Sequence, residues 1–202
     1  EEGLGDLNGM RAVVDRFGDA PRAYLVLEGM ALGQVYHRGL GVQRYRVTAQ
    51  TQGGHSWADY GKPSAIHELA ALIARLTKLQ LPKRPRATFN VGVISGGTSI
   101  NTIAAQASFE LDLRSEDPAA LQSLIRSAET LFEQANRPGV QIQAEIIGQR
   151  PAGEISQNHS LAKLASKALR TQGVQPQFNI GSTDANIPLS RGLPCVCIGL
   201  TR

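Results

Sequence analysis

The sequence predicts an α+β domain at residues 42–150, placed between two segments of a separate α/β domain at 1–41 and 151–202. Residues 103–113 alternate between apolar and polar side chains, which is the period of a strand with one buried face. Continuous apolar runs at 23–27 and 194–200 are typical of buried strands in an α/β sheet. Asp117-Pro118, an N-cap residue followed by proline in the first turn, predicts the start of a helix.

The central segment alternates strands and helices in a recognisable order. Strands are expected at 42–51, 87–94, 102–113 and 140–147, and helices from Pro63 to before Pro82 and from Asp117 to Pro138. A loop is expected at 53–57. The order β-α-β-β-α-β is that of a ferredoxin-like domain, an antiparallel four-stranded sheet with two helices on one face.

The flanking segments have the pattern of an α/β unit. Before the central domain, Asp6 is expected to cap a helix over 7–17 that ends at Gly18, and a buried strand over 23–27 ends at Glu28. After it, helices are expected at 156–171 and 182–190 and strands at 177–180 and 194–200, with Ser182-Thr183-Asp184 as the cap of the second helix.

Composition limits the classes of partner. The net charge is +4 and the pI about 9.3, and the one basic run, Lys83-Arg84-Pro85-Arg86, lacks interleaved aromatic residues, so nucleic acid is not expected as a partner. Apolar runs are too short to span a membrane. Cys195 and Cys197 lie two apart on an expected strand, which is poor disulfide geometry, so we expect buried free thiols and a cytoplasmic protein.

Two stretches carry a family resemblance. Gly-Gly-Thr-Ser-x-Asn-x-Ile-Ala at 96–104, ending in Asp-Leu-Arg at 112–114, resembles the lid-domain signature of the M20 family of metallopeptidases and amidohydrolases. That family includes carboxypeptidase G2, acetylornithine deacetylase, aminoacylase-1 and tripeptidase-like enzymes. Glu1-Glu2, followed by Gly-Leu-Gly, resembles the Glu-Glu-x-x-Gly motif of the same family. The resemblance implies an α/β catalytic domain with an inserted lid that forms a homodimer.

Three carboxylates acquire roles through this resemblance. It implies that Glu1 is the base that activates a metal-bridging water, that Glu2 is a metal ligand, and that Glu28, at the family's spacing, binds one of two zinc ions. Adjacent carboxylates in a loop suit such a division of labour, because both side chains can converge on one centre. From the residues alone, two alternatives remain open: Glu1-Glu2 is an ordinary surface pair, and Glu28 is a solvated strand end.

Four further residues acquire roles at the substrate. The resemblance implies that His55 reaches across a dimer interface to the substrate carbonyl oxygen, and that Asn101 and Arg114 hold the substrate carboxylate or backbone. Gly181, in Gly-Ser-Thr-Asp, matches a family loop near the substrate, with Ser182 where the family has glycine. A loop histidine without a role, a surface arginine and a plain helix cap remain the alternatives.

The expected function is therefore that of a central fragment of a zinc-dependent peptidase or amidohydrolase, with two Zn²⁺ per intact subunit. The family's first metal ligands, in a His-x-Asp motif, and its last histidine have no match in the 202 residues, so we expect missing sequence on both sides and an inactive fragment. The expected substrate is a small peptide or an N-acyl amino acid. A non-catalytic dimerisation or binding module is the alternative, because a fold does not fix a function.

Overall fold

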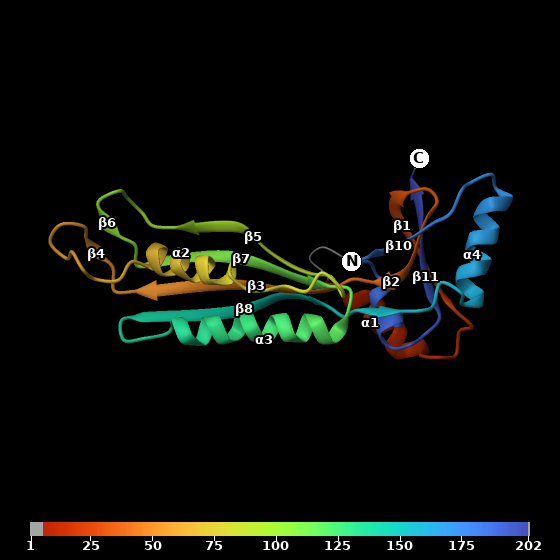
Figure 1. Ribbon diagram of the computed structural model, residues 1–202, viewed down its shortest axis with the longest axis horizontal. Helices are drawn as coiled ribbons and strands as arrows, with labels where there is room; N and C mark the ends of the chain where they lie inside the picture. The colour runs from red at the N-terminus through yellow and green to blue at the C-terminus, as the bar shows by residue number, and fades with distance from the viewer. Residues whose placement is uncertain (1–5, 202) are drawn as a thin grey trace. The chain divides into compact units, whose positions relative to one another are not determined.

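The computed structural model describes residues 6–201, which include all helices and strands named below. The chain forms two compact units: unit 1 comprises residues up to Val42, Ser115–Pro118 and the chain from Gln149, and unit 2 comprises Gln43–Arg114 and Ala119–Gly148 (Figure 1). The helices are α1 Asn8–Phe17, α2 Ala65–Leu76, α3 Pro118–Ala135, α4 Ser160–Thr171 and α5 Asn186–Ser190. The strands are β1 Tyr24–Ala31, β2 Gln34–Gly39, β3 Gly41–Thr51, β4 Gly54–His55, β5 Ala87–Gly96, β6 Thr102–Ile103, β7 Gln106–Ser115, β8 Val140–Arg150, β9 Gly153–Glu154, β10 Gln177–Gly181 and β11 Cys195–Thr201.

Unit 2 is built on a four-stranded sheet in the order β5-β7-β3-β8. Figure 1 shows α2 and α3 running along this sheet, and side chains of both helices share one core with the strands. The alternation predicted for 103–113 is present in β7, where Phe109, Leu111 and Leu113 are each at most 1% exposed. On the opposite face of the sheet, Arg44 meets Asp112 and Arg46 meets Glu110, a register typical of antiparallel strands.

The expected single strand at 102–113 is broken at Ala104 and Ala105. The carbonyl of Ala104 accepts hydrogen bonds from the Ala65 N–H at 2.8 Å and the Thr51 hydroxyl at 2.9 Å. The Ala104 carbonyl therefore bonds to the start of α2 and to the end of β3. The preceding residues form the separate strand β6, which pairs antiparallel with β4, so the expected loop at 53–57 contains a short strand.

Unit 1 contains a mixed sheet in the order β1-β11-β2-β10, with β9 added to β2. β1 pairs with β11 and β10 pairs with β2 in parallel, whereas β11 and β2 are antiparallel. The strands predicted at 177–180 and 194–200 are confirmed, and Cys195 and Cys197 are fully buried and form no disulfide. No helix in the described chain is long and apolar enough to cross a membrane.

Strand β1 and helix α1 differ from the expectations in one detail each. Tyr24 and Val26 are buried, but Leu25 and Leu27 are each 62% exposed, because alternate side chains lie on opposite faces and the described core covers one face. Leu7 is the N-cap residue of α1, and the carboxylate of the preceding Asp6 accepts a hydrogen bond from the Gln149 N–H at 2.7 Å.

Asn186, at the start of α5, joins three segments of unit 1. Its side-chain amide donates to the carbonyls of Leu40 at 2.7 Å and Pro151 at 2.8 Å, and its oxygen accepts from the Thr183 N–H at 2.9 Å. The residue is 0% exposed, so water cannot replace these bonds. Buried backbone groups require a partner, and here one side chain supplies three.

We predict that Asn186→Ala lowers the free energy of unfolding by about 2–3 kcal/mol, because it leaves buried backbone groups without partners. Urea denaturation followed by far-UV circular dichroism measures the change. The control is Asn179→Ala, since Asn179 is exposed and its side-chain amide donates at 3.3 Å to Gln34. An equal loss in both variants would show that Asn186 has no special role in stability.

Candidate functional site

His55 lies on β4 and is held by the loop that follows it. Its N–H donates to the Asp59 carboxylate at 2.8 Å, and its carbonyl accepts from the Asp59 N–H at 2.9 Å. Asp59 also pairs with Lys62 at 2.7 Å. The hydrogen bond with Lys62, and after it the one from the His55 N–H, lowers the pKa of the Asp59 carboxyl. The Asp59 carboxylate therefore stays charged to a lower pH than an ordinary aspartate, and in this charged form it accepts the His55 N–H.

The His55 ring has a defined donor atom. Its Nδ1 lies 3.2 Å from the Trp57 N–H and 3.4 Å from the Ala58 N–H, and both of these groups donate. A neutral imidazole that accepts at Nδ1 carries its proton at Nε2. The ring therefore carries an N–H donor at Nε2, which is the group needed to stabilise an anionic oxygen.

Asn101 lies beside His55. The Ser56 N–H donates to the Asn101 carbonyl at 3.0 Å, and Thr102, the next residue, pairs with His55 across β4 and β6. The Asn101 side-chain oxygen accepts from the Ser99 hydroxyl at 2.9 Å, which leaves its NH₂ group as a donor. Two predicted site residues, 46 positions apart in the sequence, are thus brought together at one end of unit 2.

A pocket lined partly by hydroxyl groups adjoins this pair. It has a volume of about 440 Å³ and is lined by residues of β5, β6 and β7 and of the turn after β5, among them Ser95, Thr98, Thr102 and Ser108. Gly96 has a φ of +156° and a Cβ there would lie 2.5 Å from that of Ala107, so glycine is required. Four hydroxyl side chains, Gln106, two alanines and two glycines line this pocket, and none of these residues is charged.

Arg114 lies at the other end of β7 in a cluster of three charges. Its guanidinium donates to both oxygens of Asp112, at 2.6 and 3.1 Å, and Arg44 donates to the same carboxylate at 2.9 Å. Burial opposes charge on Asp112, but the hydrogen bonds from Arg114 and Arg44 outweigh it and lower the pKa of this carboxyl. The hydrogen bond to Asp112 in turn raises the pKa of Arg114.

Asn101 and Arg114 are not part of one site within a chain. From Gln106, at the start of β7, to Arg114 an extended strand covers about 26 Å. A tripeptide spans about 10 Å at most. One small molecule cannot contact both ends of the same strand.

Glu28 and Gly181 lie in unit 1. Glu28 is inside β1, opposite Gly199 of β11, so the strand does not end there as expected but continues to Ala31. Gly181 ends β10, and a Cβ at this position would lie 2.0 Å from the Tyr36 ring, so packing requires glycine. β1 and β10 are three strand spacings apart in the sheet, about 14 Å.

The carboxylates Glu1 and Glu2 lie outside the described residues. Within residues 6–201, no group of three or more His, Cys, Asp or Glu side chains is placed to hold a metal ion. Zinc requires three or four protein ligands. The described residues therefore do not by themselves fit a zinc site, and Glu28 is a single carboxylate donor.

Two residues of the site were not anticipated from the sequence. Asp59 orders the His55 loop, and Asp112 holds Arg114. Asp112 lies two residues before Arg114 and therefore on the same face of the strand, a signal that the sequence contains. Asp59 lies four residues after His55 in a loop without periodicity, and only the fold shows its role.

The chain was compared with known families and structures. Residues 38–140, just over half of the chain, match the family model described as a peptidase dimerisation domain. The chain therefore belongs to the M20 peptidase dimerisation-domain family. No curated protein matches the sequence.

Solved structures share the fold. Aminopeptidase PepT from Bacillus cereus has a TM-score of 0.77 at 20% identity, and a tripeptidase from Staphylococcus aureus has 0.78 at 20%; in each case 96% of this chain and 52% of the other are covered. An aminobenzoyl-glutamate utilization protein from Klebsiella pneumoniae has 0.73 at 19%, covering 93% and 52%. The chain spans about half the length of these structures.

We predict that Asp112→Asn lowers stability at pH 7 by about 1 kcal/mol, because a partly exposed charged pair is weakened by solvent. The native carboxyl has a lowered pKa, so its contribution is complete above the unfolded-state value of about 3.9 and disappears as the pH falls below it. Urea midpoints of wild type and variant should therefore converge below about pH 4.

The matched control is Glu110→Gln, on the same face of β7 and paired with the exposed Arg46 at 3.0 Å. This variant should change stability by less than about 0.5 kcal/mol at every pH. A constant difference between wild type and Asp112→Asn from pH 7 to 3 would contradict the role of the Asp112 charge.

Proposed function

We propose that the intact protein is an M20-type hydrolase of peptide or N-acyl amide bonds, with residues 42–150 as its ferredoxin-like lid and dimerisation domain. The strand order β5-β7-β3-β8 with α2 and α3 supports the ferredoxin-like assignment. The observation that carries the proposal is the proximity of His55 and Asn101, each with an N–H donor available, at one end of a domain of the peptidase family.

The proposed roles follow from the chemistry of each side chain. His55 Nε2–H would donate to the oxyanion that forms when the substrate carbonyl is attacked, and Asn101 would hold the adjacent backbone. Arg114 would bind the substrate carboxylate as a bidentate donor once part of its contact with Asp112 is exchanged. Glu1 would serve as the base.

Zinc remains a proposal for the intact protein, with Glu2 and Glu28 each supplying a ligand. When bound, it would polarise the carbonyl and lower the pKa of a water molecule. The exposed Leu25 and Leu27 support a larger α/β domain, since the matched structures are about twice as long and additional chain would cover this face. The two buried cysteines form no disulfide, which supports a reducing, cytoplasmic location.

The length of β7 favours an active site shared between two subunits. His55 and Arg114 of one chain cannot contact the same small substrate, because about 26 Å of strand separates the two ends. A homodimer removes this limit, since His55 and Asn101 of one subunit would complete the site that contains Arg114 of the other. We therefore propose that His55 acts in the partner's site.

Strand β5 is the proposed dimer edge. It exposes two consecutive apolar residues, Val93 at 55% and Ile94 at 57%, and its residues 91–96 include no charged side chain. The opposite edge, β8, exposes Ile146 at 54% but carries Glu145, and charged residues on an edge oppose pairing with another chain. β5 is therefore the better template for adding a second copy.

We predict that Ile94→Lys converts a dimer of this chain into a monomer, because the substitution places a charge in the paired edge. The dimer dissociation constant should rise about tenfold or more, which corresponds to at least about 1.4 kcal/mol. Light scattering coupled to size-exclusion chromatography measures the mass. Ile146→Lys, at similar exposure on β8, is the control and should leave the dimer intact. If Ile146→Lys gives a monomer and Ile94→Lys leaves a dimer, the interface lies at β8 instead.

We predict that His55→Ala reduces turnover of the intact protein about 100- to 1,000-fold, the usual loss for one oxyanion donor. Hydrolysis of di- and tripeptides and N-acyl amino acids with added zinc provides the assay. The exposed His67 on α2 gives the control, and His67→Ala should keep full activity.

Mixing His55→Ala with Glu28→Ala tests the shared site. Each variant alone is expected to have at most about 1% of the native activity, and mixed dimers should regain one working site. If subunits exchange and no activity returns, His55 does not act in the partner's site. If the wild-type intact protein hydrolyses none of these substrates, the alternative of a non-catalytic dimerisation module is favoured.

A further inference from the structure

Helix α4 of unit 1 forms one wall of a pocket that the proposed hydrolase roles do not use. The pocket has a volume of about 470 Å³, within the usual range for small-molecule sites. Its other wall is Phe178 of β10, an edge strand of the sheet, and Gln157 and Asn158 lie before the helix. None of the residues that line it is acidic.

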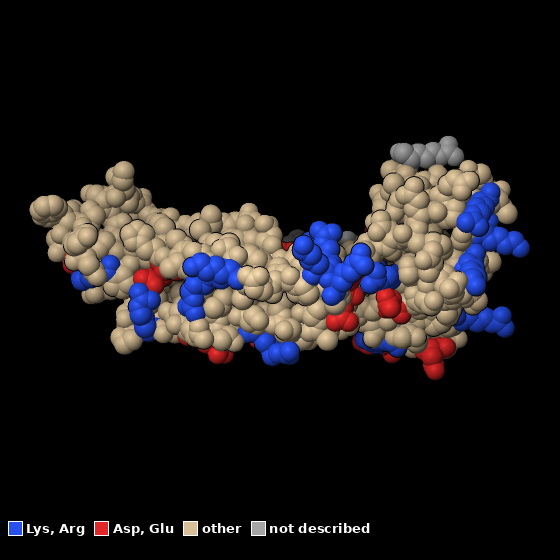
Figure 2. Space-filling model, viewed as in Figure 1, with Lys and Arg blue, Asp and Glu red and all other residues tan. Residues whose placement is uncertain are grey.

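Three cations line this pocket from a single helix face. Lys163, Lys167 and Arg170 are spaced i, i+4 and i+7, which places them on one side of α4. Figure 2 shows Lys and Arg side chains along this helix. The sequence of α4 includes no Asp or Glu, and no ion pair joins these three cations to an acid among residues 6–201.

The three exposed cations repel one another, and a bound anion lowers this repulsion. Like charges at i and i+4 destabilise a helix, and here no neighbouring carboxylate offsets the repulsion. An anionic ligand would relieve it and would receive charge-assisted hydrogen bonds from Lys and Arg. The basic face therefore points to an anion as the natural occupant.

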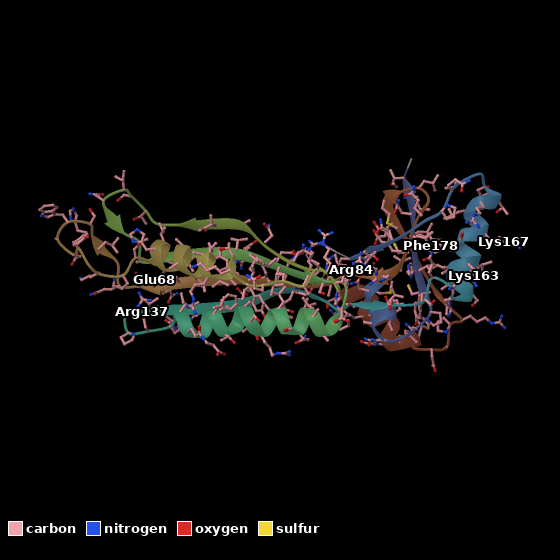
Figure 3. All side chains as sticks on the ribbon, in the orientation of Figure 1. Glu68, Arg84, Arg137, Lys163, Lys167 and Phe178 are labelled. Carbon is pink, nitrogen blue, oxygen red and sulfur yellow. The ribbon has the colours of Figure 1, made fainter. Side chains whose placement is uncertain are left out.

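The remaining lining groups suit a ligand with more than a phosphate. Gln157, Asn158 and Ser166 supply neutral hydrogen-bonding groups, and Ser166 is 6% exposed. Phe178 contributes an aromatic ring that is held edge-on against His37, with ring centroids 5.5 Å apart. Figure 3 labels Lys163 and Lys167 on α4 and Phe178 on the strand beside it. A fixed ring offers a stacking surface.

We propose that this pocket binds a nucleotide, a small molecule that carries both a phosphate chain and a planar ring. Lys163 and Arg170 are about 10 Å apart along the helix axis, so the three cations can follow a chain of phosphates, and Phe178 lines the same pocket and can contact a planar ring. The phosphates lie against the three cations, and the base stacks on Phe178.

The test is isothermal titration calorimetry of the chain with adenosine 5′-diphosphate and with pyrophosphate at low salt. Both should bind, and the nucleotide should bind at least about fivefold more tightly, because stacking of a base on an aromatic side chain adds affinity. Lys163→Gln with Lys167→Gln should weaken both ligands about tenfold or more. Phe178→Leu should remove the preference for the nucleotide and leave pyrophosphate unchanged.

The control is Lys78→Gln with Lys83→Gln, which makes the same change of charge in unit 2 and should leave both affinities unchanged. Equal weakening by the control would show non-specific attraction to a basic protein and would overturn the site. Equal affinities for nucleotide and pyrophosphate in the wild type would refute the nucleotide class. Binding of single-stranded nucleic acid without binding of either small ligand would also overturn the proposal.

Discussion

The length of strand β7 is the constraint on which the proposed chemistry depends. The strand places His55 and Asn101 at one end of unit 2 and Arg114 at the other, with about 26 Å of extended chain between them. A strand is stiff because each residue is fixed in the ladder, and its core face is filled by Phe109, Leu111 and Leu113. No rearrangement of side chains shortens it, and this length is the basis of the proposal that two subunits share the site.

Each end of β7 is ordered by its own local network. At one end, the Ala104 carbonyl joins β3 and α2, and Asp59 fixes the loop that orients the His55 ring. At the other end, Asp112 holds Arg114 and Arg44 together on the open face of the sheet. In unit 1, Asn186 has a comparable role. Its side chain donates hydrogen bonds to the carbonyls of Leu40 and Pro151, which are far apart in the sequence.

The sequence predicted most elements because their signals are local. The alternation in β7, the Asp117-Pro118 helix start and the apolar run before Leu200 each lie within a few residues. The break at Ala104 could not be predicted, since the donors that cause it come from Thr51 and Ala65, far away in the chain. Likewise, β1 passes beyond Glu28 because its partner β11 continues to Thr201.

The cysteines of unit 1 have a practical consequence. Cys195 and Cys197 are 0% exposed on β11, which has β1 on one side and β2 on the other. Burial raises the pKa of the Cys195 thiol, so its reactive thiolate is scarce while the sheet is closed. Alkylating reagents therefore gain access only when the sheet opens. The rate of cysteine labelling in native buffer then measures the rate of that opening.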